Sequence, residues 1–226
     1  MMCKIICFSG IDGSGKSSHA RLIFKELKAN GIRCKYKWLR YTNFFSLIPL
    51  TLYHTYIRTP NSPKTQISFS SETHFQTSTV INTLWTFFQL MDALLFSARY
   101  VYLPALLGYT LILDRFIVDT LVDIAFSLKN QSLLSSKLGK LFVRIIPKNS
   151  LVMIFDVDEN IAISRKNDIS EIDYLVLRRK LYHLMTETYV WQIINTHKPF
   201  DEVHDEVMEF VLLYLARAQR KIKNKC

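Results

Sequence analysis

A glycine-rich segment near the N-terminus has the residue types and the spacing that bind phosphate groups. Residues 10–17, GIDGSGKS, form a complete G-x-x-x-x-G-K-[ST] motif. Glycines let the backbone turn close to phosphate oxygens, and the helix that follows adds the positive end of its dipole. The motif predicts an ATP site in which Lys16 contacts the β- and γ-phosphates and the Ser17 hydroxyl binds Mg²⁺. The residues expected at the nucleotide are Gly10, Asp12, Gly13, Ser14, Gly15, Lys16, Ser17 and Ser18.

An acidic and a basic residue, Asp114 and Arg115, directly follow the apolar run at 111–113. An acid at the carboxyl end of a buried strand lies where open α/β sheets bind their ligands. Asp114 is suited to hold Mg²⁺ directly or through water, and Arg115 is suited to bind a phosphate group. Alone, such a pair is equally compatible with a structural ion pair. Because the chain also has a phosphate-binding motif, the sequence favours the functional interpretation of this pair.

Two adjacent cations, Arg165 and Lys166, form the third candidate. They lie in a polar stretch after the residues at 155–158. Cations in such a segment can close over a phosphoryl group during transfer and stabilise the charge of its transition state, an effect worth about 10³–10⁵ in rate. Exposed charges that keep the protein soluble explain the pair equally well from the sequence alone.

The pattern along the chain indicates which elements must position these residues. An apolar, β-branched run that ends in glycine predicts a buried strand at Lys4–Phe8. The candidates for four further strands are Arg33–Leu39, Tyr109–Leu113, Leu151–Phe155 and Gln192–Asn195. Helical periodicity predicts helices at Lys16–Asn30, Leu175–Trp191 and Phe200–Ala218. Because strands that alternate with helices imply right-handed crossovers, we expect an α/β fold with a doubly wound parallel sheet, in one domain that spans residues 1–226.

The apolar stretch Leu84–Leu107 is long enough to be considered as a membrane span. Polar residues interrupt it, and steps of three or four residues place on one helical face Trp85, Gln89, Asp92, Phe96 and Arg99. A buried helix with one polar stripe explains this pattern better than a lipid-facing helix, in which charges are costly. We therefore expect no stable membrane insertion.

Asp92 and Arg99 on that face have two interpretations. Either they pair with charges on neighbouring elements and stabilise the fold, or they form one wall of an acceptor site. In the second interpretation, Arg99 binds the phosphate of the acceptor and an aromatic ring stacks on its base. The residues expected there are Arg99, Arg40, Arg115 and Phe88 or Trp85.

The composition restricts the partners. The chain has 226 residues, with 29 Lys and Arg against 19 Asp and Glu, and a net charge of +10. This surplus suits nucleotides, nucleic acid or acidic membranes without choosing among them. Four cysteines without zinc-like spacing predict free thiols, and the N-terminus lacks the apolar core of a signal peptide, so we expect a cytoplasmic protein.

Taken together, these segments resemble the thymidylate kinase family, whose phosphate loop is very close to residues 8–18 here. The other similar segments are residues 103–108, 113–116, 155–165 and 195–207. The resemblance covers most of the chain except about 40–84. It implies a five-stranded parallel sheet, an ATP site, a lid at 158–174, and contact between Asp12 and the acceptor sugar. Because position 13 is glycine, it also implies that the catalytic arginine comes from the lid, as Arg165.

Two departures from the family concern the acceptor. The family's Arg-Glu-Pro-Gly-Gly-Thr run after the second strand is absent, and only Arg40 fits it. The family's Asp-Arg pair in the central helix is also absent, with Asp92 near that place. We therefore expect a rebuilt acceptor side in an insertion at 40–84. Its Ser/Thr-rich part, Thr59–Thr83, is expected to be a surface loop or a cover for the substrate.

The sequence thus predicts Mg²⁺- and ATP-dependent phosphorylation of a nucleoside monophosphate, with dTMP as the first acceptor and with Lys16, Arg115 and Arg165 as catalytic residues. One alternative is a kinase for another phosphate-bearing acceptor, such as a nucleic-acid 5′ end or a phosphorylated sugar. The other is an ATP-binding regulator that transfers nothing. Nucleic acid remains a less favoured partner, and both a monomer and a homodimer are compatible with the sequence.

Overall fold

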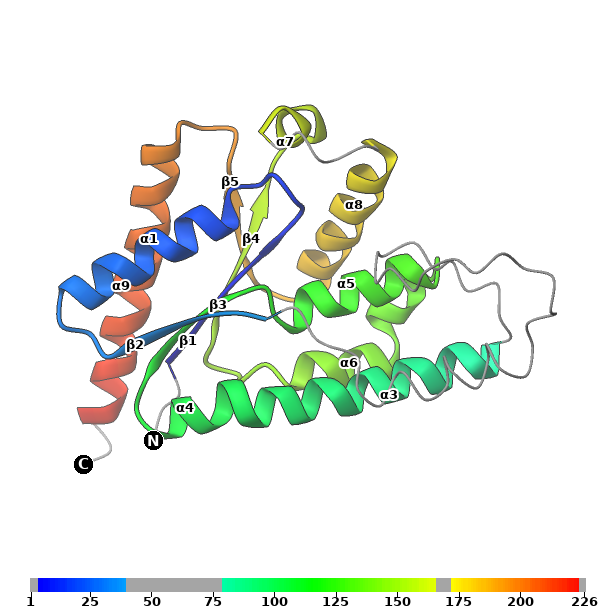
Figure 1. Ribbon diagram of the computed structural model, residues 1–226, viewed down its shortest axis with the longest axis horizontal. Coiled ribbons are helices and arrows are strands. Elements are labelled where there is room, and N and C mark those ends of the chain that lie inside the picture. The colour runs from blue at the N-terminus through cyan, green and yellow to red at the C-terminus, as the bar shows by residue number, and fades with distance from the viewer. Residues whose placement is uncertain (1–3, 40–78, 166–171, 224–226) are drawn as a thin grey trace, which may run out of the picture.

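The computed structural model describes residues 4–39, 79–165 and 172–223, and Figure 1 shows how they are arranged. The strands in these ranges are β1 (Lys4–Gly10), β2 (Cys34–Trp38), β3 (Thr110–Asp114), β4 (Leu151–Asp156) and β5 (Gln192–Asn195). They pair in parallel in one five-stranded sheet, in the order β2-β3-β1-β4-β5. Each strand overlaps the range predicted for it, so the expected α/β fold with a five-stranded parallel sheet is confirmed.

The central position of β1 explains its apolar sequence. Its residues from Ile5 to Phe8 are completely buried. Ile5 and Cys7 pack in the core on one face of the sheet, whereas Ile6 and Phe8 pack in the core on the other face. A strand that is covered on both faces has no solvent-facing positions, and its sequence is therefore a continuous apolar run.

Helices cover both faces of the sheet (Figure 1). The core around Ile6 and Phe8 is completed by α1 (Lys16–Ala29) and α9 (Phe200–Lys223). The core around Ile5 contains residues from α3 (Thr79–Ser97), α4 (Leu103–Leu106), α5 (Ile117–Ser127), α6 (Lys137–Arg144), α7 (Glu159–Arg165) and α8 (Ile172–Thr188). A short 3-10 turn, Gln131–Ser135, connects α5 to α6.

Two expectations about the helices need correction. The stretch Leu84–Leu107 is not one helix, because a π-helical segment, Ala98–Tyr102, separates α3 from α4. Residues 79–83, expected at the end of the loop Thr59–Thr83, begin α3 instead, because Val80 continues the helical apolar spacing of Leu84 and Phe87. The rest of that loop, most of the 40–84 insertion and residues 166–171 of the predicted lid lie outside the described residues.

Two further features agree with the sequence. No helix in the described ranges is long and apolar enough to cross a membrane. Cys7, buried in β1, and Cys34, half-buried in β2, are free thiols, whereas Cys3 and Cys226 lie outside the described residues. Burial, reinforced by the nearby Asp119, raises the pKa of the Cys7 thiol well above its usual range, so this thiol is unreactive.

Candidate active site at the phosphate loop

The phosphate loop connects β1 to α1 and is packed too tightly for side chains at two of its glycines. Gly10 has a φ of 141°, and a Cβ there would lie 2.5 Å from the Phe155 carbonyl oxygen of β4. Gly13 has a φ of 82°, and its Cβ would lie 2.4 Å from the Ala162 carbonyl oxygen of α7. Only glycine fits at position 13, which explains why the loop itself carries no arginine there.

Lys16, at the start of α1, is almost completely buried against this loop. Its Nζ donates a hydrogen bond of 2.9 Å to the Ile11 carbonyl oxygen and lies 3.6 Å from Oδ1 of Asp12. Burial, together with the positive charge of Arg115, lowers the pKa of Lys16 to about 8, although the Asp12 carboxylate opposes this shift. An anion that replaced water around Nζ would raise this pKa again, so the charged form of Lys16 is coupled to phosphate binding.

Arg115 directly follows β3 and has an unusual backbone conformation, with a φ of 65°. Its N–H donates to the Phe8 carbonyl oxygen (3.0 Å), which ties this turn to β1. The guanidinium forms an ion pair with Asp12 and lies 3.7 Å from Oδ1 of Asp119. Burial alone would lower the pKa of Arg115, but the carboxylates of Asp119 and Asp12 raise it above its usual value. A left-handed non-glycine residue is costly and is often found at functional sites.

Asp119 fixes the position of Arg115 and was not predicted from the sequence. Its side chain is buried, and it accepts hydrogen bonds from Ser9 Oγ (2.7 Å) and from the Tyr182 hydroxyl (2.8 Å). One turn further along α5, Asp123 forms an ion pair with Arg178 of α8. The contacts from β1, α5 and α8 therefore hold Arg115 in a single orientation. The one signal in the sequence was the i, i+4 spacing of Arg115 and Asp119.

The second predicted metal ligand, Asp114, ends β3 and is completely buried. The Tyr36 hydroxyl of β2 donates a hydrogen bond of 2.7 Å to its Oδ2. Among the described residues, no group donates a hydrogen bond to its Oδ1. The described residues also contain no cluster of three or more metal-binding side chains. Ser17 lines the cavity described below, whereas Asp114 does not. A Mg²⁺ ion bound there would need nucleotide phosphates and Ser17 as ligands, and Asp114 could act on it only through water.

A cavity of about 600 Å³ opens above the loop, a volume typical of small-molecule sites. The three predicted catalytic cations, Lys16, Arg115 and Arg165, all line this cavity. Its remaining residues are Asp12, Gly13, Ser14, Gly15, Ser17, Ser18, His19, Trp38, Thr196, Lys198, Phe200 and Val203. Arg165 is exposed and donates a hydrogen bond of 3.0 Å to the Thr196 carbonyl oxygen, so the segments after β4 and β5 meet at this cavity.

An aromatic pair lines the cavity beside Arg165. His19 of α1 stacks on Phe200 of α9, with ring centroids 4.1 Å apart and an interplanar angle of 12°. Burial, together with the nearby His204 and Arg165, lowers the pKa of His19 to about 4, so its ring is neutral at pH 7. Phe200 remains 45% exposed, which leaves part of its ring available to a planar ligand. Neither ring was predicted, because 180 residues of sequence separate these two positions.

The predicted acceptor wall on α3 is not observed as one face. Asp92 is buried, Phe88 is half-buried, and Arg99 is exposed on the π-helical segment, with its guanidinium 5.5 Å from the Tyr100 ring. None of the three lines the cavity described above. The acceptor wall stays a prediction, because residues 40–78 of the expected acceptor side lie outside the described residues. Arg40 lies outside the described residues.

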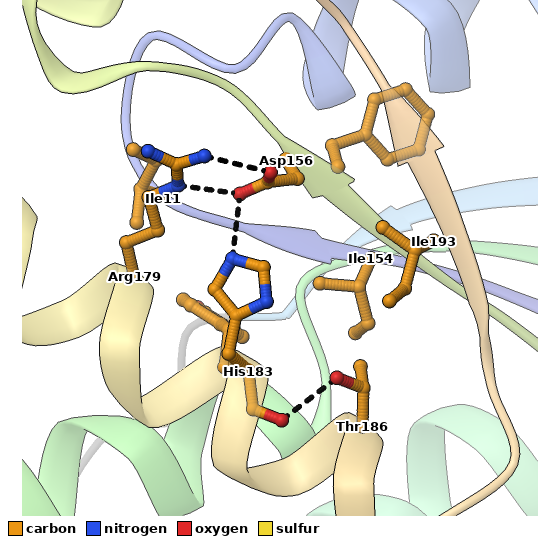
Figure 2. Close-up of a pocket in the computed structure, with 9 residues that line it drawn as sticks. Ile11, Ile154, Asp156, Arg179, His183, Thr186 and Ile193 are labelled. Atoms are coloured by element: carbon orange, nitrogen blue, oxygen red, sulfur yellow. Dashed lines mark hydrogen bonds and ion pairs between the residues drawn. The ribbon is translucent and has the colours of Figure 1, made fainter.

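A second, much smaller cavity of about 10 Å³ lies between β4 and α8 (Figure 2). Asp156 at the end of β4 accepts two hydrogen bonds from Arg179 (2.7 and 2.9 Å) and lies 3.1 Å from His183 Nε2. Burial raises the pKa of Asp156, but the hydrogen bonds and charge of Arg179 lower it below its usual value. Because this cavity has room for about one water molecule, we assign the cluster to the attachment of α8 to the sheet.

The fold and the site together define an α/β protein with a parallel five-stranded sheet, whose glycine-rich loop opens on a cavity lined with cations. A scan against models of protein families and a search of curated proteins find no match to this chain. The resemblance to the thymidylate kinase family therefore depends only on the sequence segments quoted above.

Proposed function

We propose that this chain transfers the γ-phosphoryl group of ATP to a nucleoside monophosphate, with dTMP as the first acceptor to test. The observation that supports this most strongly is the convergence of Lys16, Arg115 and Arg165 on the cavity above the phosphate loop. Phosphoryl transfer needs little covalent chemistry from the protein. It needs positioned reactants and positive charge around the transferring group, and the three cations that line this cavity are suited to supply the charge.

On the donor side, the backbone of residues 12–17 holds the phosphates of ATP, and Lys16 neutralises the β- and γ-phosphates. Ser17 and, through water, Asp114 would hold Mg²⁺, which when bound shields the charge of these phosphates. The exposed part of Phe200, whose ring stacks on the buried His19, lies next to Arg165 and Lys198 and is suited to contact the base of the nucleotide. Arg165 lies close enough to this pair to affect the pKa of His19.

On the acceptor side, Arg115 binds the phosphate that receives the transferred group, and Asp12 binds the sugar. Their ion pair holds both side chains at the cavity, where Asp119 and Tyr182 fix Arg115 from behind. Arg165, at the end of α7, neutralises the charge that develops during transfer. Its helix packs directly on Gly13 of the loop, so a movement of α7 would carry Arg165 relative to the donor phosphates.

One observation favours a second candidate, a kinase for a phosphate-bearing acceptor without a base. Phe88, the ring expected to stack on a base, does not line the cavity, and neither does Arg99. Among the described residues that line the cavity, Arg115 and Asp12 are suited to recognise a phosphate and a hydroxyl group. A phosphorylated sugar would satisfy both contacts.

A steady-state assay of ADP formation separates these candidates. Purified protein with Mg²⁺ and ATP is given dTMP, other nucleoside monophosphates, a 5′-phosphorylated oligonucleotide or sugar phosphates, each in a separate reaction. Stimulation by dTMP supports the first proposal, whereas stimulation only by sugar phosphates supports the second. If none of the phosphate-bearing acceptors stimulates ADP formation, the protein is not the kinase proposed here.

A further inference from the structure

Two neighbouring arginines of α8 differ in how completely their hydrogen-bond donors are used. Arg179 donates two hydrogen bonds to Asp156 (Figure 2) and a third to Glu159. Arg178 is only 1% exposed and forms an ion pair with Asp123 of α5. Among the described residues, however, neither Nε nor Nη1 of Arg178 makes a hydrogen bond, and Oδ1 of Asp123 makes none either. A buried guanidinium with unused donors is costly and rare, so Arg178 calls for an explanation beyond packing.

Arg178 belongs to the same polar network as Arg115. The Tyr182 hydroxyl of α8 donates a hydrogen bond of 2.8 Å to Asp119 of α5, which fixes Arg115. Arg178 lies four residues before Tyr182, and Asp123 lies four residues after Asp119. The ion pair is therefore the next polar contact between α5 and α8, about one helical turn from the group that holds Arg115.

The charges around the two arginines are also shared. Burial alone would lower the pKa of Arg178, but the Asp123 carboxylate raises it well above its usual value, and Asp12 contributes in the same direction. Burial also opposes the raised pKa of Arg115, and Asp12 and Asp123 add to the effect of Asp119 there. Both guanidiniums thus lie within electrostatic reach of Asp12. Arg178 does not line the cavity that Asp12 lines, and Asp123, whose side chain is 29% exposed, is the more accessible member of its pair.

We propose that Arg178 is a second binding group for the phosphate of the acceptor, and that Asp123 occupies its place until the acceptor binds. This inference rests on the proposed function, because it assigns Arg178 to the molecule that receives the phosphoryl group. The planar fork of a guanidinium matches two oxygens of a phosphate or a carboxylate. The Asp123 carboxylate meets this fork without hydrogen-bond geometry. A phosphate group has more oxygens and more charge, so it is the better partner for the unused donors.

A permanent ion pair that attaches α5 to α8 is the simpler account of the same contact. Loss of either partner of a buried pair is usually destabilising, and this account connects neither residue to the acceptor. It gives no reason for the unused donors of Arg178. The two accounts differ in sign for Asp123→Asn. If Asp123 competes with the acceptor, its neutralisation strengthens acceptor binding, whereas loss of a structural support leaves that binding unchanged or weakens it.

Isothermal titration calorimetry of the full chain with dTMP, in the absence of ATP, tests the inference. Asp123→Asn should raise the affinity at least about threefold, because Arg178 is then available before the acceptor arrives. Arg178→Met should lower it at least about tenfold, because charge-assisted hydrogen bonds are lost. The double variant should bind as weakly as Arg178→Met, since Asp123 acts through Arg178. Arg178→Lys keeps the charge of the ion pair but loses the fork. It should also weaken binding, and it carries the test if Arg178→Met does not fold.

Glu187→Gln is the matched control for Asp123→Asn. Glu187 is exposed near the end of the same helix as Arg178 and lies outside the cavity. Its substitution removes the same charge and should leave the affinity for dTMP unchanged. The melting temperature shows which variants are folded, and ribose 5-phosphate serves as a second probe if dTMP does not bind.

Four results would overturn the inference: a wild type that binds neither probe, a folded Asp123→Asn without increased affinity, a folded Arg178 variant that binds like the wild type, or a double variant that binds more tightly than Arg178→Met. The proposed function fails in a different way. Binding that follows these predictions without acceptor-dependent ADP formation would refute the transfer alone. Formation of dTDP with unchanged dTMP affinity in the Arg178 variants would refute this inference alone.

Discussion

Around the phosphate loop and along α3, the same kind of reasoning from sequence had different outcomes. At the loop, Asp12, Lys16 and Ser17 line one cavity together with Arg115 and Arg165. Along α3, the spacing of Asp92 and Arg99 predicted one face, but the structure buries Asp92 and exposes Arg99. A glycine-rich motif specifies the backbone itself, because its glycines allow conformations that other residues avoid. A spacing argument specifies only the direction in which a side chain leaves the helix axis, whereas burial depends on which other elements cover that point.

The largest expected effect on turnover is at the residues proposed to bind ATP. Lys16→Ala removes the cation at the β- and γ-phosphates, so acceptor-dependent turnover should fall on the order of 10³–10⁵-fold. The fold should survive, because burial disfavours the charged form of this lysine. A coupled enzyme assay of ADP formation checks this prediction, and the melting temperature shows whether the variant is folded. A folded variant with turnover near that of the wild type would remove Lys16 from the mechanism.

Arg165 should have the next largest effect. Arg165→Ala should lower kcat by about 10³-fold, the lower end of the range for such cations, with a smaller change in the KM for ATP, if its charge acts mainly in the transition state. Arg144→Ala is the matched control, because Arg144 is exposed at the end of α6 and lies outside the cavity. A change confined to the KM for ATP would instead assign Arg165 to binding of the donor, beside the His19–Phe200 pair.

Substitutions at two glycines with similar φ angles measure separately the cost of a left-handed backbone and the cost of a packing collision. Gly31→Ala places a Cβ in open space at a φ of 72°, so its cost is the left-handed backbone alone, about 1–2 kcal/mol. Gly13→Ala adds a collision with the Ala162 backbone at a φ of 82° and should cost a further 1–3 kcal/mol, roughly. Chemical denaturation measures both. Gly13→Ala should also weaken turnover, because α7 carries Arg165. Equal losses of stability would show that α7 does not pack on the loop.

Because of the pKa of Lys16, the affinity for ATP should depend on pH in a direction that can be predicted. ATP favours the charged lysine, which predominates below about pH 8 in the free protein. Affinity for a non-hydrolysable ATP analogue should therefore fall as the pH rises above 8, by at most about tenfold per pH unit, and binding near pH 8 should take up protons. Calorimetry in buffers of different ionisation enthalpy measures this uptake. Lys16→Met should abolish it; uptake that persists in this variant must come from another group.

The smallest effect is expected on α3. Arg99→Met keeps the apolar part of the side chain and removes a charge that does not line the cavity. We expect stability within about 0.5 kcal/mol of the wild type and an unchanged KM for the acceptor. Arg115→Met, in contrast, should raise the acceptor KM, because Arg115 lines the cavity. If Arg99→Met also raises the acceptor KM, the contrast between the two regions fails.

The parts of this molecule that sequence predicts well are local in the chain. The three central strands, β1, β3 and β4, were predicted because each is a short apolar run, and the loop because eight consecutive residues specify it. The edge strands β2 (CKYKW) and β5 (QIIN) carry polar residues and are mostly not buried, so their sequences are weaker signals. The contacts that orient the site are not local. Tyr36 reaches Asp114 across 78 residues, and Ser9 reaches Asp119 across 110. No periodicity in one segment indicates such a partner. Helix α5 was also missed, since most of its residues from Ile117 to Ala125 are buried and its polar side is limited to Asp119, Thr120 and Asp123.

The central claim is that the γ-phosphoryl group leaves ATP for a phosphate-bearing acceptor, and the identity of the labelled product tests it most directly. The purified chain is incubated with Mg²⁺, dTMP and ATP labelled in the γ-phosphoryl group, and the products are separated by chromatography, with Lys16→Ala as the control. We predict label in dTDP for the wild type and none for the variant. If dTMP is not the acceptor, label should appear in another phosphate-bearing acceptor from the screen. Label that stays in ATP, or appears only as inorganic phosphate with every acceptor, would contradict the account.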